Sequence, residues 1–282
     1  MRQSRWHRPV SGSAWIMGVL NCTPDSFSDG GKYADADTAI QHGLAMRDAG
    51  ASLIDVGGES TRPGSEPVSL QEELSRVVPV VKALSAAGCS VSIDTTKAEV
   101  IRQAVQAGAV VVNDVTALQG DPDALAAVAD LGTDVCLMHM QGTPETMQDN
   151  PHYGDVVREV MGFFEQRITA CSQAGIVESA ILLDPGIGFG KRLEDNLALI
   201  THIADFKRVF GMPVLLGVSR KSFLGMITGS SVEDREIETA AAVSACICNG
   251  ADVLRVHDVS AQIKAVQVAS ALYAQTGDVV TA

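Results

Sequence analysis

The feature that most constrains the fold of this sequence is a set of eight short apolar runs spread along most of the chain. Each run is four to six residues long and carries few charges, which is typical of parallel strands covered by helices on both faces. The runs are Trp15–Leu20, Ser52–Val56, Ser90–Ile93, Val110–Asn113, Asp134–Met138, Ala180–Leu183, Pro213–Val218 and Asp252–Val256. A glycine precedes seven of them, and glycine is favoured just past a helix C-terminus. These glycines are Gly50, Gly88, Gly108, Gly132, Gly175, Gly211 and Gly250.

Between the runs, apolar residues recur at helical spacing, and each such face predicts a helix that packs on a core. The faces are Leu70, Leu74, Val77, Val78, Val81 and Leu84; Val100, Ile101, Ala104 and Val105; Val156, Val160, Phe163, Phe164, Ile168 and Cys171; Ile237, Ala240, Ala241 and Ser244; and Ile263, Val266 and Ala269. Eight strands alternating with eight helices predict an α/β fold, a single (β/α)8 TIM barrel spanning 1–282. A doubly wound open sheet is the alternative, but it would not need eight equivalent units. We find no linker or low-complexity segment between domains.

Composition narrows the possible partners. The chain has 21 Lys and Arg against 34 Asp and Glu, and its net charge of -13 disfavours nucleic acid and anionic membranes. Any anionic substrate therefore needs a local cationic site. No run approaches the ~18 apolar residues of a membrane span. The first nine residues are basic, but no long apolar segment or cleavage site follows them, so we expect no signal peptide. The six cysteines lack metal-ligand spacing, so we expect reduced thiols and a cytoplasmic protein.

Polar residues follow the apolar runs, at the strand ends where an α/β barrel carries its active site. From the first run to the eighth they are Asn21, Asp55–Gly64, Asp94–Thr95, Asn113–Asp114, Met138–His139, Asp184–Lys191, Gly217–Phe223 and Arg255–Asp258. Four side chains would meet at one barrel mouth: Asp94, Asn113, Asp184 and Lys221. Burying such groups costs stability unless they are paired, so we interpret them as a ligand site.

Positive charge gathers at the same strand ends. Arg62, Arg255 and His257 would lie on the rim of the mouth, and a helix is expected just after His257. Cationic donors beside a helix N-terminus predict a site for an anion such as phosphate. Asp114 and Asp258 are interpreted as helix caps.

The chain resembles the dihydropteroate synthase family through seven motifs, in order and at matching spacings. They are Met17–Gly31, Asp55–Gly64, Ser92–Thr95, Asn113–Asp114, Asp184–Lys191, Gly217–Gly225 and Arg255–Asp258. The resemblance implies a TIM-barrel transferase of folate biosynthesis, a homodimer that uses Mg²⁺ and is a target of sulfonamides. Its reaction would join (7,8-dihydropterin-6-yl)methyl diphosphate to 4-aminobenzoate, releasing diphosphate and forming 7,8-dihydropteroate.

The resemblance also implies a site residue by residue. The pterin would contact Asp94, Asn113, Met138, Asp184, Phe189, Gly217, Lys221 and Arg255. The diphosphate would contact Asn21, Thr61, Arg62, Arg255 and His257, with Asn21 also the Mg²⁺ ligand. The 4-aminobenzoate would contact Phe27, Thr61, Arg62, Pro63, Ser219, Lys221 and Ser222. The catalytic residues would be Asp94, Arg62, Lys221, Arg255 and His257.

The chemistry of these groups suits that reaction. The amino-pyrimidinone edge of a pterin presents two adjacent donors, which the Asp184 carboxylate can accept side by side. Breaking the carbon–oxygen bond leaves a diphosphate anion and a pterin-stabilised cation, and Asp94 would stabilise that cation. The family resemblance favours this dissociative, SN1-like route, although direct displacement stays open.

Two other functions compete with the synthase. A pterin-dependent methyltransferase would share the pterin residues but would not need Asn21, Arg62, Arg255 and His257 as a diphosphate set. A non-catalytic pterin-binding paralogue would not need the loop from Asn21 to Gly31. One departure from the family is Cys22, which stands where Val is usual and where we expect little effect.

Overall fold

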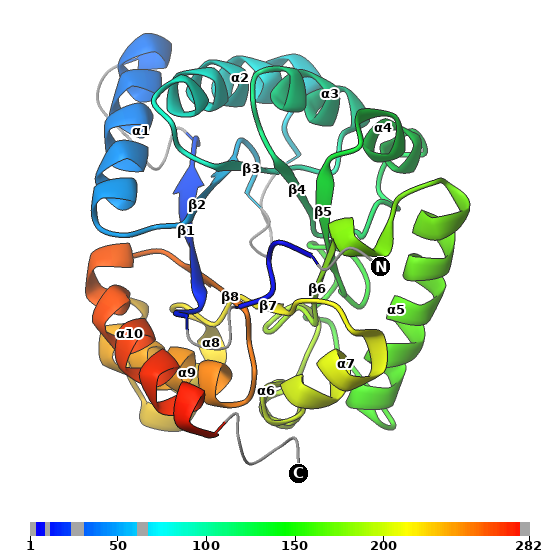
Figure 1. Cartoon of the computed structure of the whole chain (residues 1–282), viewed down its shortest axis with the longest axis vertical. Coiled ribbons are helices and arrows are strands. Elements are labelled where there is room, and N and C mark those ends of the chain that lie inside the picture. Colours follow the sequence, from blue (N-terminus) through cyan, green and yellow to red (C-terminus); the bar gives the residue numbers. More distant parts are fainter. Residues whose placement is uncertain (1–3, 9–11, 24–30, 61–66, 277–282) are drawn as a thin grey trace.

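Eight parallel strands form a nearly closed barrel in this computed structural model, which describes residues 4–8, 12–23, 31–60 and 67–276 (Figure 1). The strands are β1 (Trp15–Asn21), β2 (Leu53–Gly57), β3 (Val91–Asp94), β4 (Val111–Asp114), β5 (Asp134–Met138), β6 (Ile181–Asp184), β7 (Leu215–Leu216) and β8 (Val253–Val256). Their order is β6-β5-β4-β3-β2-β1-β8-β7, and a parallel bridge between Leu183 and Val214 links the two edges. The predicted barrel is therefore confirmed.

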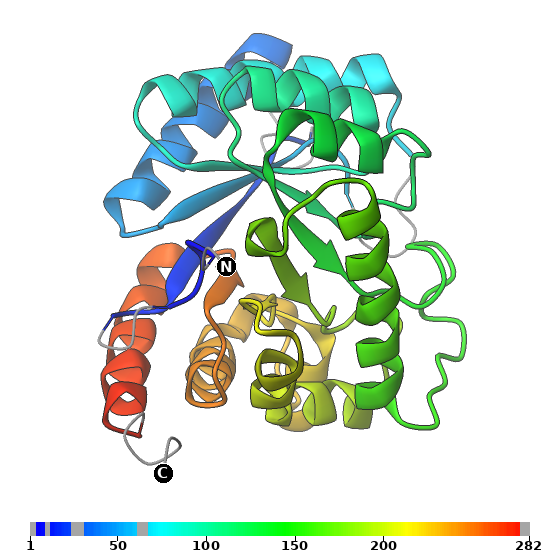
Figure 2. The same cartoon turned by 45° about the vertical axis from the view of Figure 1, so that its right-hand side comes forward.

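Helices form an outer ring around the strands, as the turned view in Figure 2 also shows. They are α1 (Gly31–Asp48), α2 (Leu70–Ala86), α3 (Ala98–Gln106), α4 (Ala124–Leu131), α5 (Val156–Gln173), α6 (Leu193–Thr201), α7 (Ile203–Phe210), α8 (Ser222–Thr228), α9 (Glu236–Cys248) and α10 (Val259–Thr276), with short 3₁₀ helices η2 (Glu178–Ala180) and η3 (Val232–Asp234). The sequence predicts one helix after each strand, but two α-helices follow β6 and two follow β7. Within the described ranges, no helix has the length and apolar character that a membrane span requires.

The elements lie close to where the sequence predicts them. All seven predicted helix-end glycines have positive φ, from 61° to 115°, the left-handed conformation that glycine adopts without strain. Strand β7 is shorter than its predicted run, which begins at Pro213, a residue with no N–H to donate to a neighbouring strand.

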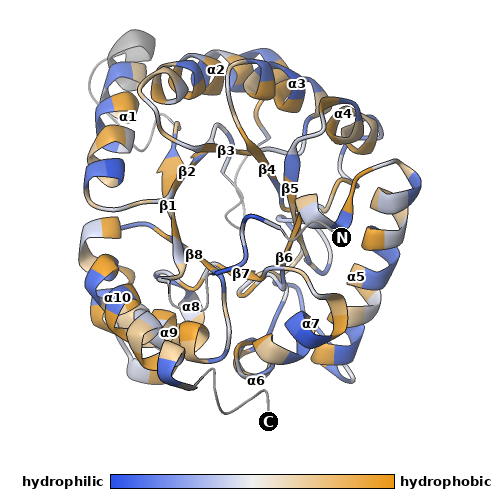
Figure 3. Ribbon diagram, viewed as in Figure 1, coloured by the Kyte–Doolittle hydropathy of each residue, from blue (hydrophilic) through white to orange (hydrophobic). Residues whose placement is uncertain are grey.

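One predicted helix face is wrong. Ile237 is 84% exposed, and Ala241 is exposed as well, so the face predicted from them does not pack on the core. Helix α9 instead buries Thr239, Val243, Cys246 and Ile247. Small residues occur all around this helix, and hydropathy alone therefore defines its buried face poorly. Figure 3 shows the more general pattern, with apolar residues toward the strands and polar residues outside.

The barrel interior changes from apolar to polar along its axis. The layer toward the amino-terminal ends of the strands is a buried apolar cluster. It consists of Met17, Leu53, Val111, Cys136, Leu182, Leu215 and Val253 together with Trp6. Side chains of a strand alternate between its two faces, so residues two positions further along face the same interior. Two residues after Leu53, Val111, Cys136, Leu182 and Val253 come Asp55, Asn113, Met138, Asp184 and Arg255. The strand period therefore places a polar layer at the mouth, above an apolar floor.

The N-terminal segment, residues 4–8, closes the opposite end of the barrel. Trp6 is 5% exposed within the apolar floor, and its indole Nε1 donates to Asp134 Oδ2 at 2.6 Å. Arg8 donates its backbone N–H to Asp252 Oδ1 at 2.9 Å, and its guanidinium lies 3.8 Å from the ring centroid of Tyr273. In Figure 1 this dark blue segment crosses the centre of the ring. The described residues before β1 contain no strand, so we see no N-terminal hairpin there.

Candidate active site

Strand register brings the predicted polar residues to one edge of the barrel. Along the mouth, Asn21 pairs with Gly57, Gly57 with Asp94 and Asp94 with Asn113, and further on Met138 pairs with Asp184. Asp94, Asn113, Met138 and Asp184 are all buried, and Asn21 is half-buried. The sequence prediction that these strand ends converge is therefore correct.

Arg255 lies inside this mouth rather than on its rim. Its Nε donates to Asp55 Oδ2 and its Nη2 to Asp94 Oδ2, both at 2.7 Å. Asn113 Nδ2 donates to the same Asp55 oxygen at 2.9 Å. The rim position predicted for Arg255 is wrong because, two residues after Val253 in β8, its side chain enters the barrel.

Asp55 is the residue to which the sequence analysis gave no role. It is fully buried and binds both Arg255 and Asn113, and its Oδ1 has no hydrogen-bond partner among the residues that the structure describes. A carboxylate inside a continuous apolar strand was the signal that could have identified it, because a buried charge needs a partner.

The carboxylates of the mouth are buried, and Lys221 and Arg255 are half-buried. Burial raises the pKa of Asp94 to about 7; Arg255 opposes that rise and Asp55 adds to it. Burial lowers the pKa of Lys221 to about 8, with Arg255 acting in the same direction. Burial also raises the pKa of Asp184, against the effect of the Gly186 N–H and of the nearby lysines. Strongly perturbed acids and bases in one mouth are typical of a functional site.

The loop after β6 brings an aromatic wall to this mouth. Asp184 Oδ1 accepts the Gly186 N–H at 2.7 Å, which fixes the start of the loop. Lys221 Nζ lies 4.0 Å from the centroid of the Phe189 ring, within range of a cation–π contact. Gly188 makes room for this pair, since a Cβ there would lie 3.0 Å from Lys221 Cδ.

The remaining described candidates lie around the mouth. His257 is half-buried, and its Nδ1 lies 3.0 Å from Oγ of the buried Ser219. Gly217 follows β7 beside Arg255, and Ser222 is exposed as the first residue of α8. Phe27, Thr61, Arg62 and Pro63 lie outside the described residues.

Cys22, Asp114 and Asp258 lie outside the polar layer of the mouth. Cys22 is buried, and burial raises its pKa to about 12, so it is a neutral thiol. Asp258 caps α10, accepting from Ala261 N at 2.9 Å. Asp114 is not a helix cap; it closes a turn by accepting the N–H groups of Thr116 and Leu118.

Comparison with known proteins agrees with this geometry. Residues 17–257 match the family of pterin binding enzymes. The chain is 47% identical to the dihydropteroate synthase of Escherichia coli K12 over 257 residues, which are 91% of this chain and 90% of the relative.

Solved structures lead to the same family. A Yersinia pestis dihydropteroate synthase with a sulfonamide drug complex has a TM-score of 0.88 and 46% identity, covering 94% of this chain and 95% of that one. A Xanthomonas albilineans dihydropteroate synthase with 4-aminobenzoic acid has a TM-score of 0.86 and 47% identity, covering 93% and 94%. Because such identity extends over nearly the whole length of each relative, the chain belongs to the dihydropteroate synthase family of pterin-binding enzymes.

Proposed function

We propose that the protein joins (7,8-dihydropterin-6-yl)methyl diphosphate to 4-aminobenzoate, giving 7,8-dihydropteroate and diphosphate. The observation that carries the proposal is the polar layer of the barrel mouth. Asp94, Asn113, Asp184 and Arg255 lie there at the ends of four strands, with Arg255 bound to Asp94 and Asn113 bound to Asp55. A relative solved with 4-aminobenzoic acid supports the second substrate.

The pterin edge would be recognised by groups whose other bonds are already made. Asp184 uses Oδ1 for the Gly186 N–H and keeps Oδ2 for the adjacent donors of the amino-pyrimidinone. Asn113 donates to Asp55, which leaves its amide oxygen to accept a ring N–H. Lys221 would donate to ring acceptors, while Met138 and Phe189 would provide apolar walls.

Charge would then drive the bond cleavage. Loss of diphosphate leaves a pterin cation, and Asp94 supplies a carboxylate in a buried setting where its field is weakly screened. Hydrogen bonds to Asp55 and Asp94 fix the Arg255 guanidinium. It could stack on a face of the pterin ring and also attract the leaving diphosphate. His257, Thr61 and Arg62 would complete the diphosphate contacts, and the arylamine would attack the cation without a strong base.

The described residues fit Mg²⁺ that enters with the diphosphate rather than a protein cage. They contain no cluster of three or more His, Cys, Asp or Glu side chains able to hold a metal. Asn21 Oδ1 and Asp94 Oδ2 both lie near Gly57, since an added Cβ there would lie 3.9 and 3.7 Å from them. Mg²⁺ commonly takes one or two protein oxygens and completes its shell with phosphate and water. Bound with Asn21, it would neutralise charge on the leaving group.

The alternatives explain fewer of these residues. A methyltransferase acting on a methylated pterin has no diphosphate to hold, whereas Asn21, Arg255 and His257 surround the mouth here. We also propose, from the family, that residues 1–282 form one domain of a cytoplasmic homodimer.

Diphosphate release tests the proposal. The protein is incubated with the dihydropterin diphosphate, 4-aminobenzoate and Mg²⁺, and we expect diphosphate and 7,8-dihydropteroate in equal amounts. Sulfonamides should compete with 4-aminobenzoate, because they share its arylamine and an acidic group. Methyl transfer from methyltetrahydrofolate, or pterin binding without turnover, would instead favour one of the two alternatives.

A further inference from the structure

A buried lysine lies behind the pterin wall, in a place that the proposed reaction does not use. Lys191 is 5% exposed, and its Nζ lies 3.1 Å from His139 Nδ1, 3.3 Å from His139 O and 3.0 Å from Phe189 O. An ammonium group has three N–H donors, and these are three acceptors. The amino group therefore joins the end of β5 to the loop after β6.

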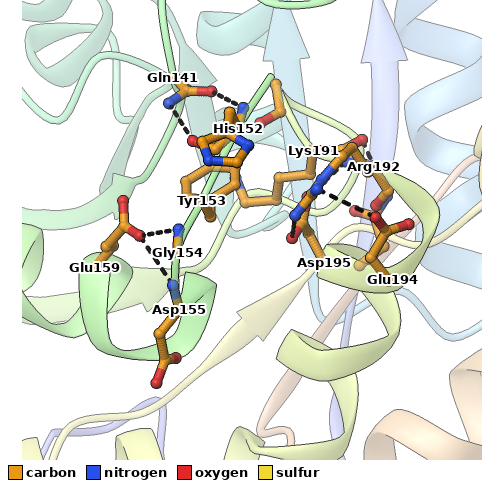
Figure 4. Close-up of polar contacts among 12 residues, drawn as sticks. Gln141, His152, Tyr153, Gly154, Asp155, Glu159, Lys191, Arg192, Glu194 and Asp195 are labelled. Carbon is orange, nitrogen blue, oxygen red and sulfur yellow. Dashed lines mark hydrogen bonds and ion pairs between the residues drawn. The ribbon is translucent and has the colours of Figure 1, made fainter. Parts of the chain in front are cut away.

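Further bonds hold the same two loops together. Tyr153 Oη donates to Gly190 O at 2.7 Å, and Gln148 Nε2 donates to Gly188 O at 3.0 Å. Gln141 and the His152 backbone exchange two hydrogen bonds of 3.1 Å, which fold the loop after β5 back on itself; Figure 4 shows this pair beside Tyr153 and Lys191. We call the contacts between residues 139–153 and 185–191, together with the Gln141–His152 pair, the loop clasp.

The loop clasp leads directly into the pterin site. The backbone carbonyl of Phe189 is held by Lys191, while the ring of the same residue lies against Lys221. Gly186, whose N–H binds Asp184, has a φ of +71°, and a Cβ there would lie 1.9 Å from His139 O. The two loops are thus in direct contact where the key carboxylate is fixed, so movement of one would move the other.

Charge adds to this mechanical link. Burial lowers the pKa of Lys191 to about 7, while Asp184 raises it. Burial, together with Lys191, lowers the pKa of His139 to about 3, so its imidazole stays neutral and Nδ1 can accept. Among the described residues, the other charged groups that act most strongly on Lys191 or Asp184 are Lys221, Asp195 and Arg255. Below pH 7 the Lys191 ammonium therefore favours the ionised form of Asp184.

We propose that Lys191 is a positioning residue for pterin recognition: it holds the loop after β6 in place through the loop clasp and supports the carboxylate form of Asp184. The inference rests on the proposed function, because it assumes that a pterin binds at Asp184. Lys191 itself lies behind the wall of the pocket, so its effect passes through Phe189 and Asp184.

Binding of 6-hydroxymethylpterin, which lacks the diphosphate and cannot react, tests this role. Affinity is measured from pH 5 to 9 for the wild type, Lys191→Met, Tyr153→Phe and Lys207→Met. Met keeps an unbranched stem but removes the charge and the donors, whereas Tyr153→Phe loosens the loop clasp and leaves the charge in place. Lys207→Met is the matched control, since Lys207 Nζ also binds a carbonyl and a carboxylate, Gly250 O and Asp252, but at the far end of the barrel.

We expect Lys191→Met to weaken binding about tenfold at pH 6, the size of one charge-assisted contact. The acid midpoint of its affinity should rise by about half a pH unit or more, because Asp184 loses a neighbouring cation. Tyr153→Phe should weaken binding about threefold at every pH without moving that midpoint. Lys207→Met should lower Tm and leave affinity and midpoint unchanged. In turnover, Lys191→Met should raise KM for the dihydropterin diphosphate more than it lowers kcat.

Wild-type affinity and an unmoved midpoint in Lys191→Met would overturn the inference. If that variant does not fold, Tyr153→Phe decides, and wild-type affinity there would equally overturn it. A wild-type protein that binds no pterin at any pH would mean that the proposed function itself is wrong.

Discussion

Arg255 shows how much the environment of one residue decides its role. It is an interior residue bound to two carboxylates, and one of them, Asp55, is fully buried. Burial disfavours its charged form, but Asp55 and Asp94 outweigh that effect and raise its pKa. A buried ion pair adds little net stability, yet loss of one partner leaves the other charge uncompensated.

Arg255→Ala should therefore destabilise the barrel as well as impair catalysis. We expect a loss of about 3–5 kcal/mol in the free energy of unfolding, because Asp55 would keep a buried charge with no cation beside it. Urea unfolding and kcat/KM measure the two effects. The double variant Asp55→Asn, Arg255→Ala is the control, and it should recover stability but not activity. Wild-type stability in the single variant would contradict this role of the Arg255–Asp55 ion pair in the fold.

Asp184→Asn isolates the pterin contact. The amide oxygen can still accept the Gly186 N–H, which turns the amide nitrogen toward the pterin donors. We expect a loss of ~1–3 kcal/mol in pterin binding, because two donors then face each other. Isothermal calorimetry measures it, with Asp134→Asn at the other end of the barrel as control. Equal pterin affinities for wild type and Asp184→Asn would rule out Asp184 as the pterin acceptor.

At the scale of elements, sequence patterns predict the strands and helix ends, because these depend on repeated, local preferences of the chain. Eight apolar runs and seven helix-end glycines each report a local preference of the backbone, and all of them lie in or beside the expected elements. Hydropathy cannot distinguish the inside face from the outside face of a strand that is buried on both sides. It therefore does not show that Arg255 and Asp55 point into the barrel. The contact of Lys191 with His139 joins residues 52 positions apart, and no periodic pattern encodes it.

The packing of the N-terminal segment could not be predicted from sequence patterns either, because residues 4–8 are too few to show a hydrophobic period. Trp6 nevertheless fills the floor of the barrel, with an edge-on contact to Trp15 at 6.0 Å between ring centroids. The segment is thus part of the core, although it precedes the first strand.

Trp6→Ala should reduce the stability of the fold without changing pterin binding at the active site. Removing a buried Trp leaves a cavity, and we expect a loss of about 3–5 kcal/mol. For a barrel of this length the corresponding fall in Tm is roughly 5–15 °C. Trp6→Phe keeps an aromatic ring but loses the bond to Asp134, so its loss should be smaller. Thermal unfolding measures both, and pterin affinity at 20 °C should not change. A Tm within 2 °C of wild type for Trp6→Ala would contradict the role of this segment as a plug.

At the scale of the whole molecule, apolar side chains are exposed along α8, η3, α9 and α10. They are Met226, Ile227, Val232, Ile237, Val268 and Leu272, and Ile237 is the most exposed of them at 84%. These helices are neighbours in Figures 1 and 2, and α9 packs along α10. Exposed apolar residues gathered on neighbouring elements are typical of a surface that another protein covers. The proposed homodimer gives this face an occupant, a second copy of the chain.

Ile237→Lys tests that arrangement. An exposed side chain contributes little to the fold of one subunit, so the variant should keep the wild-type Tm at low protein concentration. In a dimer it would place a charge in an apolar contact, and we expect the dimer Kd to rise at least about tenfold, or 1.4 kcal/mol. Light scattering across a dilution series measures the mass of wild type and variant. Val177→Lys is the matched control, because Val177 is 63% exposed but precedes η2, which follows α5 in the chain and is not one of these elements. If Ile237→Lys dissociates at the same concentration as wild type while Val177→Lys dissociates earlier, the subunits meet through another face.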